Sequence, residues 1–174
     1  SVLYYVDPQT GIIYVANNFG VVEFDGSQWN LFPVPNRTKI RSLAIDNSGK
    51  LFIGSQGDFG YFFPDKNGGY QYVSLVDSLQ PQYQNIDEVW KVFIEDEKVY
   101  FCTFSNIYIY ENGSVNTIET NLYLEPSFFI NNQLYLQSPG NPLMSLNKDD
   151  VLEKIPGGEV FKDKLITGLL PYSK

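Results

Sequence analysis

The stretch Gly11-Ile12-Ile13-Tyr14-Val15-Ala16 decides the fold of this chain, because the chain repeats it. A turn leads into an apolar strand, and a short gap leads into a second strand that ends in another turn. The later copies are Ser48–Gly54, Glu97–Cys102 and Asn132–Gln137. Measured between Ile13, Leu51, Val99 and Leu134, the intervals are 38, 48 and 35 residues. Repeats of this length built from short strands indicate a β-propeller or a related array.

Each repeat is expected to hold four antiparallel strands. The expected strands lie near residues 2–6, 12–16, 21–24 and 29–33; 40–45, 50–55, 60–63 and 70–75; 89–94, 98–104, 107–110 and 115–119; and 126–130, 133–137, 143–146 and 151–155. The corresponding blades span about 1–35, 36–76, 88–120 and 123–156, with a polar insert at 76–87. A strand at 164–171 is expected to open a further blade at 160–174. The predicted fold class is therefore all-β: one partial propeller domain over 1–174, with about four four-stranded antiparallel blades plus one extra strand.

The local patterns agree with packed blades. Ile12–Ala16 is apolar at consecutive positions, which is typical of a strand that is buried on both faces. A two-layer sandwich would give a cleaner alternation of polar and apolar residues. Asp25-Gly26 and Asn112-Gly113 are strong signals for hairpin turns.

The composition of the chain argues against several classes of function. The chain has 174 residues, 43% of them hydrophobic and 16% aromatic, with a net charge of −8 and a pI near 4.4. An acidic surface argues against contact with nucleic acid, because phosphate binding needs basic residues. No stretch approaches the roughly 20 apolar residues of a membrane span.

Little catalytic chemistry is available. The chain has no histidine, so it cannot build a Ser-His-Asp triad, a Cys-His pair or a histidine metal site. Its one cysteine, Cys102, lies in an apolar strand and is expected to be a buried, inert thiol. The run Asp46-x-Ser48-Gly49 has the start of a calcium loop, but Gly57 stands where the closing Glu is needed. We expect no catalytic residue, no metal site and no cofactor.

The candidate ligand-binding residues lie in the gaps between second and third strands, which gather on one face of a propeller. They are Asn17, Asn18, Phe19, Gln56, Asp58, Phe59, Ser105, Asn106 and Asn141. Amides and aromatic faces suit the hydroxyl groups and C–H faces of a sugar. The same residue types also form ordinary turns, so a purely structural role stays open.

The first two units share further motifs. Unit one carries Phe24-Asp25-Gly26 followed by Trp29 and Phe32, and unit two carries Asp46-x-x-Gly49 followed by Gly57-Asp-Phe-Gly60. With these motifs, the two units resemble the two-component regulator propeller repeat. In units three and four, Ser105-Asn106 and residues 139–141 replace the glycine-rich gap. The prediction of these two blades therefore depends on the repeat spacing more than on the motif. In particular, the chain is similar to the N-terminal part of the sensor region of Bacteroidetes hybrid two-component and three-tyrosine-motif regulators.

This resemblance implies a periplasmic, non-catalytic sensor segment of a bacterial signal-transduction regulator, although no targeting segment is visible in the chain. It implies further partners: the remaining blades and an output domain, either a histidine kinase or a helix-turn-helix domain. An oligosaccharide or other small ligand and a homodimer are also expected.

Two rival functions stay open at this point. The blades could serve only for structure or dimerisation, without a small ligand. Alternatively, a carboxylate pair could make the chain a carbohydrate-active enzyme, with Asp58 and Glu88 as the positions to test. Adjacent acidic residues that could supply an acid and a base are Asp87-Glu88, Glu95-Asp96-Glu97 and Asp149-Asp150.

Overall fold

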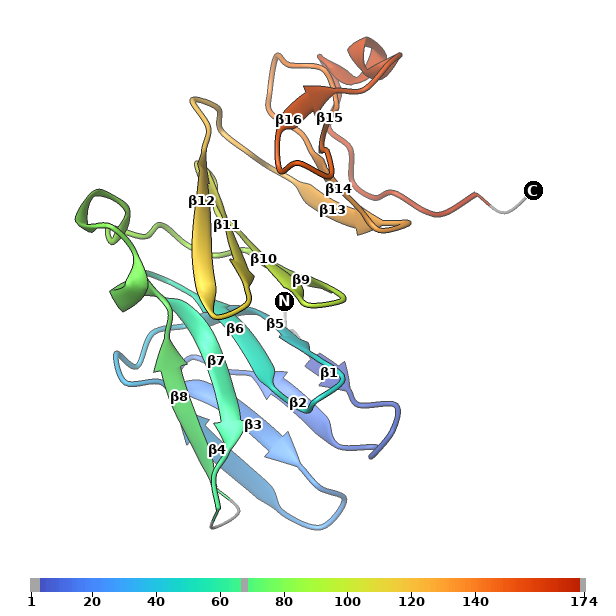
Figure 1. Ribbon diagram of the computed structural model, residues 1–174. Coiled ribbons are helices and arrows are strands. Elements are labelled where there is room, and N and C mark those ends of the chain that lie inside the picture. Colours follow the sequence, from blue (N-terminus) through green and yellow to red (C-terminus); the bar gives the residue numbers. More distant parts are fainter. Residues whose placement is uncertain (1–3, 67–68, 173–174) are drawn as a thin grey trace. The chain divides into compact units, whose positions relative to one another are not determined.

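A computed structural model describes residues 4–66 and 69–172 and shows four four-stranded antiparallel sheets (Figure 1). Blade 1 holds β1 (Tyr4–Val6), β2 (Ile13–Ala16), β3 (Gly20–Phe24) and β4 (Trp29–Pro33). Blade 2 holds β5 (Ile40–Ile45), β6 (Leu51–Ser55), β7 (Phe59–Pro64) and β8 (Tyr70–Ser74). Blade 3 holds β9 (Lys91–Glu95), β10 (Lys98–Cys102), β11 (Asn106–Glu111) and β12 (Ser114–Glu119). Blade 4 holds β13 (Ser127–Ile130), β14 (Gln133–Leu136), β15 (Met144–Leu146) and β16 (Leu152–Lys154). The prediction of four four-stranded blades is confirmed.

The additional strand predicted at 164–171 is wrong. This segment is irregular, and the chain before it forms a short 3-10 helix, η3 (Gly158–Phe161). A strand needs a hydrogen-bonded neighbour, and among the described residues no strand pairs with this segment. The insert between blades 2 and 3 contains two more short 3-10 helices, η1 (Val76–Ser78) and η2 (Pro81–Tyr83).

The chain divides into two compact units. Unit 1 comprises Ser1–Thr103 and Tyr108–Thr117, and unit 2 comprises Phe104–Ile107 and Ile118–Lys174. Unit 1 therefore contains blades 1 and 2 and most of blade 3, and unit 2 contains blade 4. That the whole chain forms one propeller domain stays a prediction.

The core of unit 1 lies between its blades. One buried cluster joins blades 1 and 2 and includes Tyr14, Val21, Leu51 and Phe62. A second cluster joins blades 2 and 3 and includes Phe52, Phe59, Phe101 and Tyr108. The sheets are thus stacked face to face, as propeller blades are.

The strand β6 explains why consecutive apolar residues are needed. All five of its residues are buried. Because successive side chains of a strand point to opposite faces, Leu51 and Ile53 pack towards blade 1, whereas Phe52 packs towards blade 3. The prediction that second strands are buried on both faces is confirmed for β6. It is wrong for Ile12–Ala16, the stretch from which it was drawn: only Tyr14 is buried in β2, because no described sheet covers the other face of blade 1.

The strand order places the turns of each sheet at two ends. In blades 1 and 2, the turns between first and second strands and between third and fourth strands share one end, which we call the turn end. The turns between second and third strands lie at the other end, which we call the loop end, together with the segments that lead into the next blade. In blade 3, the turn-end hairpin Asn112-Gly113 has positive φ values of 51° and 80°, which Asn and Gly tolerate best.

Candidate ligand-binding site

The loop-end residues of blade 1 are exposed. Asn17, Asn18 and Phe19 form the turn between β2 and β3. Their backbone also has a structural task, because the Asn17 carbonyl accepts a hydrogen bond from the Ile40 amide at 3.2 Å. This turn therefore joins blade 1 to the start of blade 2 while its side chains face solvent.

The loop-end residues of blade 2 require a correction. Gln56 is exposed, but Phe59 is fully buried, with ring centroids 4.6 Å from Phe101 and 4.9 Å from Tyr108. The reason is that β7 begins at Phe59, so its side chain points between two blades. Phe59 is a core residue and offers no aromatic platform to a ligand.

Asp58, the residue directly before this strand, is also buried. Its Oδ1 atom accepts a hydrogen bond from the Ser74 hydroxyl at 2.7 Å, and its backbone carbonyl accepts one from the Ser55 amide at 2.9 Å. Burial raises the pKa of this carboxyl, although the hydrogen bond from Ser74 acts in the opposite direction. These contacts give Asp58 a role in closing the turn around Gln56.

The remaining predicted residues belong to unit 2. The Ser105 carbonyl accepts hydrogen bonds from the Thr120 amide at 3.2 Å and its hydroxyl at 2.7 Å. Asn106 begins β11, and the Asn141 side-chain amide donates to Ser138 and to a backbone carbonyl at 3.2 and 3.3 Å. A site shared by these residues and the loops of unit 1 stays a prediction.

The structure reveals a charged group at the loop end that sequence reasoning missed. The Arg41 guanidinium pairs with Glu88 at 2.8 Å and lies over the Trp90 ring, 4.7 Å from its centroid. Gln56 forms an isolated β-bridge with Glu88. The available signal was a single arginine inside the otherwise uncharged strand Ile40–Ile45. Glu88, considered as a catalytic partner of Asp58, is held here by Arg41.

A pocket of about 610 Å³ lies at the turn end, between blades 2 and 3. Three turns supply its rim: the β5–β6 turn, the β9–β10 turn and the β11–β12 turn. Its lining residues are Asp46, Asn47, Ser48, Lys50, Phe52, Ile94, Asp96, Glu97, Val99, Tyr110, Asn112 and Gly113. All of them belong to unit 1. Carboxylates, amides and aromatic rings thus surround one space.

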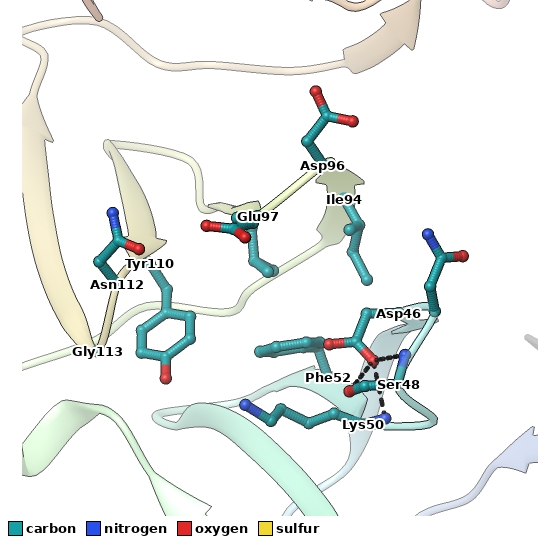
Figure 2. Close-up of a pocket in the computed structure, with 12 residues that line it drawn as sticks. Asp46, Ser48, Lys50, Phe52, Ile94, Asp96, Glu97, Tyr110, Asn112 and Gly113 are labelled. Carbon is teal, nitrogen blue, oxygen red and sulfur yellow. Dashed lines mark hydrogen bonds between the residues drawn. The ribbon is translucent and has the colours of Figure 1, made fainter.

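The ammonium group of Lys50 lies over aromatic rings in this pocket. Figure 2 shows the Lys50 amine beside the rings of Phe52 and Tyr110. The Lys50 Nζ atom lies 4.5 Å from the centroid of Tyr61, 5.8 Å from that of Phe52 and 6.0 Å from that of Tyr110. A cation over the face of an aromatic ring is attracted by the negative charge of that face. The position of Lys50 follows from Asp46, which fixes the turn before β6.

The Asp46 carboxylate organises this turn. Its Oδ1 atom accepts hydrogen bonds from the Ser48 amide at 2.8 Å, the Ser48 hydroxyl at 2.6 Å and the Lys50 amide at 2.9 Å (Figure 2). The arrangement is an Asx turn, which explains the Asp46-x-Ser48-Gly49 pattern without a metal ion. Among the residues described, no three His, Cys, Asp or Glu side chains cluster as metal ligands.

The rest of the pocket provides polar contacts. Figure 2 shows Glu97 and Asn112 above the rings, whereas Asp96 points away from them. Burial raises the pKa of Tyr110, and the neighbouring Tyr61 and Asp46 act in the same direction. The Tyr110 phenol therefore keeps its proton at neutral pH and can donate a hydrogen bond. The pocket can offer donors, acceptors and an aromatic surface to one ligand.

The predicted ligand-binding residues lie in other turns than the three that line this pocket. The sequence indicates a turn or the start of a calcium loop at Asp46–Gly49 and a hairpin turn at Asn112-Gly113, and it indicates a ligand site at neither. The missed signal was the spacing, because Phe52 follows the first turn by three residues and Tyr110 precedes the second by two.

Unit 2 has a smaller pocket of about 330 Å³, bordered by Glu125, Gln137, Pro139, Gly140 and residues 162–165. No helix within residues 4–66 and 69–172 is long and apolar enough to cross a membrane.

Solved structures share this fold. An extracellular domain described as part of a hybrid two component system from B. thetaiotaomicron matches with a TM-score of 0.62 and 17% identity, over 89% of this chain and 21% of that one. A second such domain from the same organism matches with a TM-score of 0.58 and 15% identity, over 86% and 22%. Virginiamycin B lyase from Staphylococcus aureus matches with a TM-score of 0.66 and 14% identity, over 88% and 55%.

These likenesses establish the propeller-like fold and nothing finer. No family model matches the sequence, and no curated protein matches it either. The chain spans about a fifth of the length of the two extracellular domains and about half of the lyase. The same fold therefore occurs both in regulator domains and in an enzyme.

Proposed function

We propose that this chain is a propeller segment of an extracytoplasmic sensor in a bacterial signal-transduction regulator, and that it recognises a small ligand without catalysis. The observation that carries the proposal is the fold shared with extracellular domains of two hybrid two component systems. The motifs of units one and two, which resemble the regulator propeller repeat, support it independently.

The turn-end pocket supports a ligand that is rich in hydroxyl groups. Asp46, Glu97 and Asn112 provide acceptors and donors, and Phe52 and Tyr110 provide ring faces. Three carboxylates and one ammonium line the pocket, so an anionic ligand would meet net repulsion. A neutral oligosaccharide fits this balance best.

Enzymatic function has weaker support. A catalytically inactive form of virginiamycin B lyase carries an alanine in place of a histidine, and the present chain contains no histidine. These 174 residues therefore cannot supply that group. Asp58 and Glu88, the pair considered for glycoside hydrolysis, are engaged by Ser74 and Arg41 respectively.

A structural or dimerisation module is the second candidate function. Blade 1 carries large exposed apolar residues on one face, and such patches mark interaction surfaces. In this alternative the chain would self-associate in the absence of any ligand.

The test has two arms. Sequencing the gene on both sides should reveal a signal peptide and further repeats, then a membrane span and a kinase or helix-turn-helix domain. A stop codon directly after Lys174 would contradict the sensor proposal. In the intact protein, a transcriptional reporter should respond to at least one neutral oligosaccharide, and Tyr110→Ala should abolish the response while Phe19→Ala should not.

A further inference from the structure

One face of blade 1 is entirely apolar. Strand register aligns its side chains in two rows across the sheet. The rows are Val6, Ile13, Phe24 and Trp29, and Tyr4, Val15, Val22 and Leu31. Tyr4 is 66% exposed, Trp29 61% and Leu31 52%. No charged residue interrupts either row, so this face presents a continuous hydrophobic surface to solvent.

The opposite face of blade 1 is covered. Tyr14 and Val21 belong to the buried cluster shared with blade 2, and the Tyr14 and Tyr70 hydroxyls lie 3.2 Å apart across the two blades. Blade 1 therefore already uses one face to pack on its neighbour. Only the other face lacks a partner among the residues described.

The equivalent face of blade 2 is covered by a neighbouring sheet. Aligned on the turn glycines Gly11 and Gly49, Ile13 corresponds to Leu51 and Phe24 to Phe62. Leu51 is 1% exposed and Phe62 2%, because blade 1 packs over them. The bare face of blade 1 is thus the equivalent of a surface that a neighbouring blade covers elsewhere in the same unit.

We propose that a further four-stranded blade of the same protein, outside residues 1–174, packs on this face of blade 1. This inference rests on the proposed function, since it requires a longer propeller. The continuity of the interface argues for it, because blade 2 is covered in the same way at equivalent positions. The lyase that shares the fold is nearly twice the length of the matched region.

The occupant has a defined chemistry. The additional blade presents aliphatic and aromatic side chains, like those with which blade 1 covers blade 2. Its sheet lies about 10 Å from the sheet of blade 1, the usual distance between stacked sheets. A second copy of this chain is the less suitable occupant, because each copy carries a net charge of −8 and like charges repel.

Cysteine labelling tests the proposal directly. Leu31→Cys places a thiol on the bare face, and Ser27→Cys places one on the exposed β3–β4 turn of the same blade as a matched control. The native Cys102 is buried and should stay unlabelled. Maleimide labelling is followed by mass spectrometry of the peptide that carries each position, in the 174-residue chain and in the intact protein.

In the isolated chain, both engineered thiols should react at similar rates. In the intact protein, Cys at position 31 should react at least about tenfold more slowly, while Cys at position 27 should not change. Equal reactivity of position 31 in both proteins would overturn the proposal. Protection in the intact protein that is lost on dilution would also overturn it, because a second copy would then cover the face.

Tyr4→Cys repeats the measurement if Leu31→Cys folds poorly. The result is separable from the proposed function, because labelling does not depend on a ligand. An intact protein that protects position 31 but gives no reporter response would contradict sensing and leave this interface in place.

Discussion

The loop end and the turn end of blade 2 carry similar kinds of residues but use them differently. At the loop end, Asp58 and Phe59 are buried, and Glu88 from the following segment pairs with Arg41. At the turn end, Lys50 and Phe52 border an open pocket with Tyr110. Acids, amides and aromatics near a turn therefore do not by themselves identify a ligand site. What separates the two ends is whether neighbouring blades already satisfy those groups.

The largest expected effect concerns Phe59. Phe59→Ala should lower the free energy of unfolding by about 3–5 kcal/mol, because it leaves a cavity between Phe101 and Tyr108. Phe19→Ala, at the exposed loop of blade 1, should change it by less than about 0.5 kcal/mol. Urea denaturation monitored by circular dichroism measures both. Equal effects would mean that Phe59 is not part of the core.

Breaking the ion pair at the loop end should have the next largest effect. Glu88→Gln leaves the partly buried Arg41 without its charged partner and should cost about 1–2 kcal/mol. Glu97→Gln at the turn end makes the same chemical change beside an open pocket and should stay within about 0.5 kcal/mol. If Glu97→Gln were the more destabilising variant, the contrast between the two ends would fail.

Removing the ammonium from the pocket should weaken stability slightly. Lys50→Met keeps most of the side-chain stem but loses the attraction to Tyr61, Phe52 and Tyr110, which is expected to contribute about 0.5–1 kcal/mol. Lys154→Met, on the exposed strand β16, is the control. Thermal unfolding of the two variants measures the difference. Identical melting temperatures would show that the rings do not hold the ammonium.

The smallest effect is a pH dependence at Asp58. Burial raises the pKa of this carboxyl in the folded state, so its contribution to stability is complete below its ordinary value of 3.8. That contribution is lost as the pH rises through the folded-state pKa. Asp58→Asn should therefore be slightly more stable than the native chain at pH 7, and the difference should shrink at pH 3. Asp149→Asn, in an exposed turn, should show no such trend across thermal melts at both pH values.

Particular residues show how far sequence reasoning reaches. The consecutive apolar residues of second strands predicted burial on both faces, which is right for β6 but wrong for Ile12–Ala16, and Asn112-Gly113 correctly predicted a hairpin. The strand expected at 164–171 was wrong, because apolar residues form a strand only where a neighbour accepts their backbone hydrogen bonds. Phe59 was misplaced for a related reason: strand β7 begins one residue after Asp58, and the first side chain of a strand can already point into the core.

The sequence by itself determined the repeat, the four-stranded blades and the histidine-free chemistry, because these depend on local patterns and composition. Only the tertiary structure decided which end of each blade is open. The Arg41–Glu88 pair joins residues 47 positions apart, and the pocket joins three turns from two blades. Such proximity arises from stacking one sheet on the next, which no short stretch of sequence encodes. The same stacking buries Leu51 and leaves its equivalent Ile13 on an uncovered face.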